Sequence, residues 1–391
     1  MLLTSELPAD LKPTSPGAVP APVRVAYFSD AFPERNGTGA YYHDLLGQLR
    51  ERVEAVEVFQ PKSNGRRPLL SMRMPGDPGQ RLVTPSVGDV RRACDGLDPT
   101  IVVVVTPGLY GLLGVWEARR RRVPLIAAFH TDFEQLARMY WNPVSRFFAN
   151  LVLRSANRII CHASRSVLIN NAGLRDDVLR LGARNVEVIG TPLADVFIQQ
   201  PPQRIAPGLR RVCFAGRLAP EKNVEQVIAA ARALPELEFC IAGDGPLKET
   251  LQAQAHGCPN VRFLGWLQRD QLIELLDRSS LLLLPSTFET FGSVALEAMA
   301  RGRPALVSSR AGIHAWPKLR DGLFTLHTPE ELPERLRALT GLPTAEWERR
   351  SLAARSLAEE LNTGTLDHWT DLLVRHQQTL PSGVGETQGN G

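Results

Sequence analysis

The chain has 391 residues, of which 43% are hydrophobic and 22% are charged, and its formal net charge is +4. A chain of this length exceeds what one hydrophobic core usually organises, so two α/β domains are expected. The longest apolar runs are far shorter than the ~20 residues that span a bilayer, and no signal-peptide pattern opens the sequence. We therefore expect a cytoplasmic protein, and the small net charge gives no indication of a nucleic-acid partner.

The five cysteines form no Cys-x-x-Cys pair, and no Cys/His cluster has the spacing of zinc ligands. Cys161, Cys213 and Cys240 lie in apolar runs typical of buried strands, so we expect buried small side chains there. Neither a disulfide framework nor a metal site is predicted. Arginine is concentrated in the first third of the chain, including four in succession at 119–122. This run indicates either a solvated helix end or attraction to an anionic acceptor or membrane surface.

The first half of the chain alternates apolar runs with helical patterns. Residues 1–22 contain five prolines and predict a disordered leader. A strand-like segment and a glycine-bearing turn then precede an amphipathic segment at 40–52. Apolar runs follow at 53–59, 101–105, 124–129, 158–161 and 186–189. This alternation predicts an N-terminal domain over residues 23–198 with a parallel sheet covered by helices.

A second alternation begins after a proline-rich, aperiodic segment at 199–208, which is interpreted as a linker. It predicts a second α/β domain over residues 209–360. Strands are expected at 211–215, 238–242, 261–264, 281–284, 304–308 and 323–326, and helices at 223–234, 247–256, 270–278, 293–301 and 330–339. A helical pattern covers 345–378, and residues 381–391 are expected to be disordered. Two doubly wound, Rossmann-like sheets place their ligand-binding loops at the carboxyl ends of the strands, where the domains can face each other across a cleft.

Two cations follow a predicted strand that ends at Gly216. Arg217 and Lys222 lie in the loop between this strand and a helix that opens near Asn223. Cations at a strand end beside a helix N-terminus are suited to binding a diphosphate. Surface charges on an ordinary loop are the alternative interpretation.

A second loop carries carboxylates on either side of a helix start. The buried strand at 281–284 leads to Glu289, Gly292 allows close approach of the backbone, and Ser293 is a candidate N-cap. Glu297 lies about one turn into the helix. Carboxylates here are suited to accepting hydrogen bonds from vicinal hydroxyls, one pair on a hexose and one on a ribose. Alternatively, Glu289 caps a turn and Glu297 is an ordinary helix surface residue.

These two motifs, Gly-Arg-Leu-x-x-Glu-Lys and a pair of glutamates separated by seven residues, resemble those of glycosyltransferase family 4. This is a family of retaining enzymes with the GT-B fold, also called group 1 glycosyltransferases. Further segments carry the resemblance over most of residues 23–378: 106–111, 129–133, 242–246, 263–265 and 297–304.

The resemblance implies a role for each matching residue. Arg217 and Lys222 would neutralise the donor diphosphate, Glu289 would contact the donor sugar, and Glu297 would bind the ribose hydroxyls. His130 would lie near the sugar from the first domain. Together, His130, Arg217, Lys222 and Glu289 are the expected catalytic residues. The other expected donor contacts are Gly37, Gly216, Gly243, Gly265, Leu267, Phe291, Gly292 and Ser293.

The sequence also bears on the mechanism. No Asp-x-Asp pair accompanies the motifs, and Arg and Lys can replace a metal clamp, so we expect transfer without a metal or other cofactor. The resemblance implies front-face retention and a final helix, residues 361–380, that crosses back to the first domain. Two segments depart from the family pattern: 311–316 lacks a customary carboxylate, and 190–195 replaces the usual Asn-Gly-Val-Asp. Asp132 is a weaker candidate base, and Tyr140 and Trp141 would line an acceptor site or pack in the core.

The expected co-substrate is a UDP- or GDP-sugar, and the acceptor is left open. A lipid or membrane-associated glycan is favoured by the basic, apolar loop 66–74 and by a helix-like segment with Phe147, Phe148, Leu151 and Arg154. On this hypothesis the protein contacts the inner face of the membrane peripherally. The alternatives are a soluble sugar or natural-product acceptor and, in another class, a non-catalytic sugar-nucleotide binding protein. A nicotinamide dehydrogenase is disfavoured because no Gly-x-Gly-x-x-Gly follows a strand.

Overall fold

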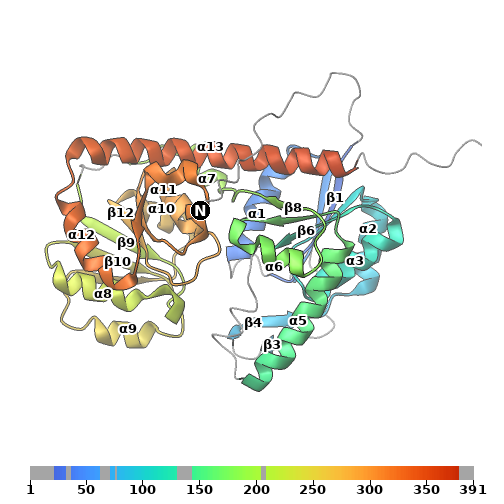
Figure 1. Cartoon of the computed structure of the whole chain (residues 1–391), viewed down its shortest axis with the longest axis horizontal. Coiled ribbons are helices and arrows are strands. Elements are labelled where there is room, and N and C mark those ends of the chain that lie inside the picture. Colours follow the sequence, from blue (N-terminus) through green and yellow to red (C-terminus); the bar gives the residue numbers. More distant parts are fainter. Residues whose placement is uncertain are drawn as a thin grey trace, which may run out of the picture.

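The computed structural model describes residues 22–31, 37–61, 71–74, 77–129, 143–203 and 208–377. The expected disordered tail, and all but the last residue of the expected leader, lie outside the described residues. Figure 1 shows two α/β lobes side by side, with the long helix α13 running along both of them.

The first lobe is built on six parallel strands in the order β2-β1-β5-β6-β7-β8. They are β1 (Arg24–Phe28), β2 (Ala55–Phe59), β5 (Ile101–Val104), β6 (Leu125–Phe129), β7 (Ser166–Ile169) and β8 (Val186–Val188). The helices of this lobe are α1 (Gly37–Leu49), α2 (Val87–Leu97), α3 (Leu109–Arg121), α5 (Pro143–Ala163) and α6 (Arg175–Arg180). A separate antiparallel pair, β3 (Ser71–Met74) and β4 (Asp77–Val83), was not predicted from the sequence.

Alternate residues of each strand point to opposite faces of this sheet. Ala26 and Phe28 pack with residues of α2, α3, α5 and α6, whereas Val25 and Tyr27 pack with α1 and the end of α13. Both faces are therefore covered, which explains why the strands read as continuous apolar runs rather than alternating ones.

The expected strand at 158–161 is wrong. These residues lie in α5, where Arg158 and Ile159 are exposed and Ile160 and Cys161 are buried. The strand of this region is β7, a few residues later. A run of four residues cannot distinguish a strand from one turn of a half-buried helix, because both patterns fit the same letters.

The second lobe also has six parallel strands, in the order β11-β10-β9-β12-β13-β14. They are β9 (Arg211–Ala215), β10 (Glu238–Ala242), β11 (Val261–Gly265), β12 (Leu281–Leu284), β13 (Ala305–Ser308) and β14 (Leu323–Leu326). Its helices are α8 (Val224–Ala233), α9 (Lys248–Gln254), α10 (Arg269–Asp277), α11 (Ser293–Ala300) and α12 (Leu332–Thr340). These elements match the predicted ones to within about two residues at each end.

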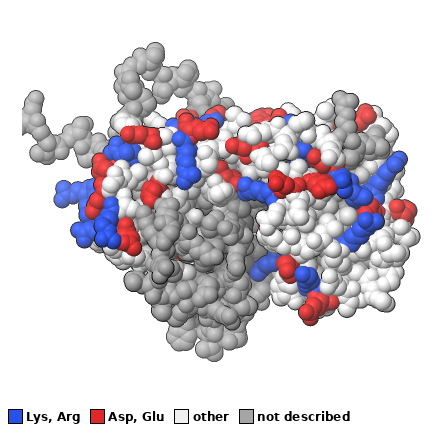
Figure 2. Space-filling model, turned by 180° about the vertical axis from the view of Figure 1, so that it is seen from behind, with Lys and Arg blue, Asp and Glu red and all other residues white. Residues whose placement is uncertain are grey.

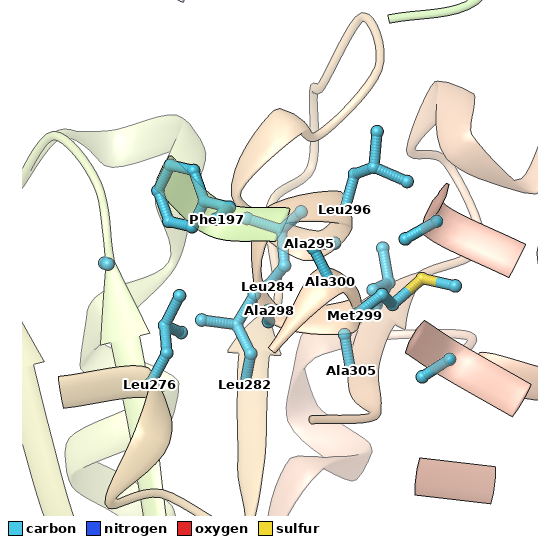
Figure 3. Packing of buried hydrophobic residues seen from close by; sticks show 14 of the residues in the cluster. Phe197, Leu276, Leu282, Leu284, Ala295, Leu296, Ala298, Met299, Ala300 and Ala305 are labelled. Atoms are coloured by element: carbon cyan, nitrogen blue, oxygen red, sulfur yellow. The ribbon is translucent and has the colours of Figure 1, made fainter. Parts of the chain in front are cut away.

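The segment before the linker belongs to the second lobe. Phe197, on the short helix α7 (Asp195–Gln199), is fully buried against β12 and α11, beside Leu284 and Ala295 (Figure 3). The sequence analysis had placed residue 197 in the first domain. The apolar side chain of Phe197 decides otherwise, because it is buried in the core of the second sheet.

Helix α13 (Thr344–Gln377) packs on both lobes (Figure 1). Near its start, Ala354 and Ala358 lie in the core beneath α11. Near its end, Trp369 and Leu373 pack on the first sheet beside α1. The helix therefore ties the two sheets together through apolar contacts at both of its ends.

The arginine run at 119–122 forms the last turn and C-cap of α3. Arg120 and Arg121 make ion pairs with Glu117 and Asp95. On the face seen in Figure 2, basic and acidic side chains are interspersed over both lobes. These pairs favour the interpretation of the run as a solvated helix end.

Candidate functional site

Each sheet has one point at which successive crossover connections leave in opposite directions. In the first sheet this point lies between β1 and β5, and in the second between β9 and β12. Loops after the two central strands separate there, so ligands of doubly wound sheets bind at this edge. The two sequence motifs with cations and glutamates follow β9 and β12, so the topology brings them together.

The loop after β9 is fixed by hydrogen bonds of its own side chains. Arg217 donates to Glu221 at 2.8 Å, and Glu221 is buried. Asn223 has a left-handed φ of 49° and donates to the carbonyl of Pro285 at 2.8 Å, which ties this loop to the one after β12. Lys222 consequently projects toward that second loop.

Lys222 forms an ion pair with Glu289, and both side chains are largely buried. Glu289 lies just before α11, whose first N–H groups are without helical partners by geometry. One expected detail is wrong: Ser293 is the first residue of α11 and not its N-cap. The cap is Gly292, which has a left-handed φ of 101° that favours glycine. The two motifs thus meet as an ammonium, a carboxylate and a helix N-terminus.

Three glycines line the carboxyl edge of the neighbouring strands. The N–H of Gly216 donates to Ala242, and the N–H of Gly243 donates to Gly265 at 2.7 Å. A Cβ on Gly243 would lie 1.8 Å from the carbonyl oxygen of Gly216, so no other residue fits without displacement of the backbone. Leu267 follows Gly265 in the loop that leads to α10 and is half-buried. Phe291, by contrast, is buried in the core behind this edge.

Glu297 is half-buried on α11. Burial raises the pKa of its carboxyl to about 7, the negative charge of Asp44 adds to that rise, and Arg269 acts against it. Asp44 belongs to α1 of the first lobe, so a charge of that lobe acts on Glu297. Glu289 thus precedes α11 and Glu297 lies about one turn into it, as the spacing predicted.

Two hydrogen bonds between the lobes lie beside this edge. Arg269, the first residue of α10, donates to Asp44 at 2.7 Å. The indole N–H of Trp316 donates to the carbonyl of Asn170 at 3.3 Å. Trp316 ends the segment 311–316 that departs from the family pattern. That segment pairs with the loop after β12: the N–H of Gly312 donates to the carbonyl of Glu289 at 3.0 Å, and the N–H of Ile313 donates to the carbonyl of Phe291.

Sequence reasoning missed both of these contacts. Asp44 and Arg269 are 225 residues apart, and each is an ordinary charged residue of an amphipathic helix. No local pattern connects them, because their contact depends on how the two sheets are placed relative to each other.

At the edge of the first sheet, Asp30 closes the loop after β1. It accepts from the hydroxyl of Thr106 at 2.6 Å and from the N–H of Tyr110 at 2.9 Å, at the start of α3. Burial raises the pKa of the Asp30 carboxyl. A Cβ on Gly108 would lie 2.4 Å from this carboxyl group, which accounts for the glycine in the 106–111 segment.

Several expected residues cannot be placed in this site. His130, Asp132, Tyr140 and Trp141 lie outside the described residues. Gly37 is the first residue of α1 and so follows the loop after β1. Within the described ranges, no group of three or more His, Cys, Asp or Glu side chains is arranged to hold a metal ion.

Comparison with known proteins agrees with this arrangement. A model of glycosyltransferase family 4 matches residues 35–193, and a model of group 1 glycosyl transferases matches residues 195–325. The chain is 27% identical over 323 residues to a GDP-mannose-dependent alpha-mannosyltransferase of Mycobacterium tuberculosis, covering 74% of this chain and 80% of that protein. It is 29% identical over 301 residues to a GDP-mannose-dependent alpha-(1-6)-phosphatidylinositol dimannoside mannosyltransferase of the same species, covering 73% and 76%.

Solved structures share the fold. The Anabaena protein HepE, in complex with UDP and glucose, superposes with a TM-score of 0.65 at 17% identity, covering 92% of this chain and all of that one. WaaG, a glycosyltransferase of lipopolysaccharide biosynthesis, superposes with a TM-score of 0.62 at 15% identity, covering 89% and 99%. The fold, the paired motifs and the two matched family models lead to one conclusion. The chain belongs to glycosyltransferase family 4, and it is a nucleotide-sugar-dependent glycosyltransferase with two Rossmann-like domains in the GT-B arrangement.

Proposed function

We propose that the protein transfers a hexose with retention of anomeric configuration and without a metal ion, and that its acceptor is a lipid or a membrane-associated glycan. The observation that carries the catalytic part is the meeting of Lys222, Glu289 and the N-terminus of α11 at the edge between β9 and β12. The relatives named above use GDP-mannose, which makes GDP-mannose the first donor to test, beside UDP-sugars.

The charge of the leaving diphosphate grows as the bond to the sugar carbon breaks. Arg217, Lys222 and the N–H groups at the start of α11 would stabilise that charge most strongly in the transition state. Lys222 is already held in the site by Glu289, so little reorganisation is needed when the diphosphate arrives. Once the diphosphate binds Lys222, Glu289 would be released from this ion pair and would accept hydrogen bonds from hydroxyls of the sugar.

In the proposed retaining step, the bond from the sugar carbon to the phosphate oxygen breaks and a bond to the acceptor oxygen forms on the same face. The acceptor's proton passes to the departing phosphate oxygen. His130 would support the sugar from the first domain, as the family resemblance implies. Fixed cations in place of a divalent metal ion support the proposal that no metal is required.

The catalytic proposal is tested by measuring transfer from GDP-mannose and UDP-glucose with and without EDTA. Lys222→Met is expected to lower kcat by about 10²- to 10³-fold, the cost of removing one fixed group that stabilises transition-state charge. Lys318→Met is the matched control, because Lys318 pairs with Glu360 on an exposed surface. Equal rates for both variants, loss of activity in EDTA, or an inverted anomeric signal in the NMR spectrum of the product would contradict the proposal.

An exposed face of α5 supports the membrane part of the proposal. Phe147, Leu151 and Val152 are 66%, 57% and 67% exposed, and Arg158 is exposed further along the helix. The sequence of α5 contains three arginines and no Asp or Glu. Apolar side chains beside arginines, without acids, suit the interface of an anionic bilayer. The side chain of Phe148 lies outside the described residues.

None of the helices in the described ranges is long and apolar enough to cross a membrane. The test of the membrane proposal is flotation with vesicles that contain anionic lipid or zwitterionic lipid alone. We expect binding to anionic vesicles and its loss in Phe147→Ser/Leu151→Ser. Leu352→Ser, at a leucine that is 74% exposed on α13, is the control. Absence of flotation would favour a soluble acceptor, and flotation that is unchanged in the double variant would refute the assignment of the membrane contact to this face of α5.

A further inference from the structure

The buried side of α5 carries amides where an amphipathic helix normally carries apolar side chains. Four residues at intervals of three and four share this side of the helix: Asn150, Leu153, Asn157 and Ile160. Asn157 is only 7% exposed, much like its neighbour Ile160. The exposed apolar side chains of the helix lie on its other faces: Phe147, Leu151, Val152 and Ile159. In this part of the chain, polar groups are therefore buried while apolar ones face outward.

The two amides lack partners of their own. The buried side-chain oxygen of Asn150 has no hydrogen-bond partner among the described residues. The side chain of Asn157 likewise makes no hydrogen bond to any described residue. Burying an amide without a hydrogen bond is unfavourable, so folded proteins rarely retain such a group without a reason. Binding of a polar ligand group is one such reason.

Asn157 lines a recess at the carboxyl edge of the first sheet. The walls of the recess come from the residues that end β5 and β6 and from Asn157, Ile160 and Cys161 of α5. Of the described residues that line it, only Asn157 and Thr106 are polar, and none is charged. The hydroxyl of Thr106 donates to the carboxylate of Asp30 and accepts from the N–H of Asp30, both at 2.6 Å. The side chain that can offer a hydrogen bond to a ligand in the recess is therefore Asn157.

The place and the chemistry of the recess indicate what it binds. It lies beside the crossover point between β1 and β5, at the edge where ligands of doubly wound sheets bind. An amide both donates and accepts, as a hydroxyl group does, whereas an anion would meet no cation here. The space inside suits one small group rather than a whole sugar ring. A single uncharged hydroxyl or hydroxymethyl group fits these conditions.

We propose that this recess receives one hydroxyl or hydroxymethyl group of a sugar or polyol acceptor, and that Asn157 determines acceptor specificity by hydrogen bonding to it. The inference rests on the proposed function, in which the second domain holds the donor diphosphate and the acceptor is bound by the first. One helix thereby serves both parts of that function. The exposed face of α5 contacts the membrane, and its buried face binds the acceptor.

The test is the variant Asn157→Leu, which keeps a similar volume but cannot form a hydrogen bond. The probes are myo-inositol, methyl α-mannopyranoside and phosphatidylinositol in mixed micelles, with GDP-mannose or UDP-glucose as the donor. The free and lipid-linked probes show whether a polyol is recognised alone or only as a headgroup. We expect the KM of the acceptor to rise about three- to tenfold, the effect of losing one hydrogen bond. The dissociation constant of GDP should not change, and Asn157→Ser, which keeps a donor and an acceptor, should recover part of the loss.

Two comparisons separate binding from a structural role. Asn157→Leu should not lower the midpoint of thermal unfolding, because no internal hydrogen bond is lost. Asn185→Leu is the matched control, since Asn185 donates to Ser166 and Glu187 at the opposite edge of the sheet. It should lower the midpoint and leave the acceptor KM unchanged.

Analogues of methyl α-mannopyranoside that lack one hydroxyl identify the group that enters the recess. One analogue should be a poorer acceptor for the wild type and lose nothing further in Asn157→Leu, because both changes remove the same hydrogen bond. Losses that add for every analogue would overturn the inference. So would an unchanged acceptor KM, a midpoint in Asn157→Leu as low as in Asn185→Leu, or hydrolysis of the donor by the wild type without transfer to any probe. If the wild type neither hydrolysed nor transferred sugar from any donor, the proposed function itself would fail, which is a distinguishable result.

Discussion

Replacing Arg301 by methionine should destabilise the second domain more than any exposed arginine can. Arg301 is 1% exposed and donates to both carboxylate oxygens of Asp277, at 2.9 and 2.6 Å. It also donates to the carbonyls of Phe197, Gln200 and Pro201, at 3.1, 2.6 and 3.1 Å. This single guanidinium thereby holds the segment at 197–201 against the second domain.

The magnitude follows from what the substitution leaves behind. Gln200 and Pro201 are exposed, so water can replace the lost donors at their carbonyls. The carboxylate of Asp277 is 5% exposed and cannot be rehydrated in the same way. Removing one partner of a buried ion pair costs about 3–5 kcal/mol, mainly because the other charge stays buried. We expect Arg301→Met to lower the free energy of unfolding by this amount.

The assay is urea unfolding followed by far-UV circular dichroism, with the free energy taken from the midpoint and slope. Arg278→Met is the matched control, because Arg278 pairs with Glu274 on the exposed side of α10 and should contribute no more than about 0.5 kcal/mol. Arg301→Met/Asp277→Leu should recover most of the loss, since neither charge of this ion pair is then left buried without its partner. A loss in Arg301→Met no larger than in the control, or losses that simply add in the double variant, would refute this reasoning.

Two further predictions concern the carboxyl edge of the second sheet and the end of α13. Gly243→Ala places a Cβ 1.8 Å from the carbonyl oxygen of Gly216, so we expect the free energy of unfolding to fall by more than about 1–3 kcal/mol. We also expect that GDP and UDP no longer stabilise this variant in thermal unfolding. In Gly88→Ala, a Cβ on α2 would meet nothing within 4 Å, so the free energy of unfolding should instead rise by about 0.5–1 kcal/mol. A similar loss of stability in both variants would contradict the steric argument. The pKa of Glu187 is held well below its usual value, first by the hydrogen bond from His368 on α13 and further by His376, Ser166 and Arg375. The stabilisation from this carboxylate is therefore present above about pH 4.3 and lost as the pH falls. The free energy of unfolding of the wild type should therefore decrease as the pH falls from about 5 to about 3, and it should decrease less steeply in Glu187→Gln. Equal slopes in the two proteins would show that the interaction contributes nothing.

Much of the site follows from short-range pattern. The strands β9, β10, β12 and β14 have the bounds that their apolar runs predicted, because strands buried on both faces must be apolar throughout. Parallel strands place the loops after them at one edge of a sheet, which is why the loops with Lys222 and Glu289 meet, although their ion pair itself was not predicted. Sequence alone therefore determined the fold class, the family resemblance and the two motifs that meet at the edge between β9 and β12.

Other features were decided only by tertiary packing. Residues 159–161 are as apolar as a strand, yet they continue a helix, because one side of α5 buries Ile160 and Cys161. Phe197 lies within the predicted first domain by sequence order, but its ring is buried in the core of the second domain. Asp44 and Arg269 show the limit most clearly. A charged residue on a helix is compatible with solvent, an ion pair or a binding site, and which of these it meets depends on surfaces formed by residues hundreds of positions away in the chain.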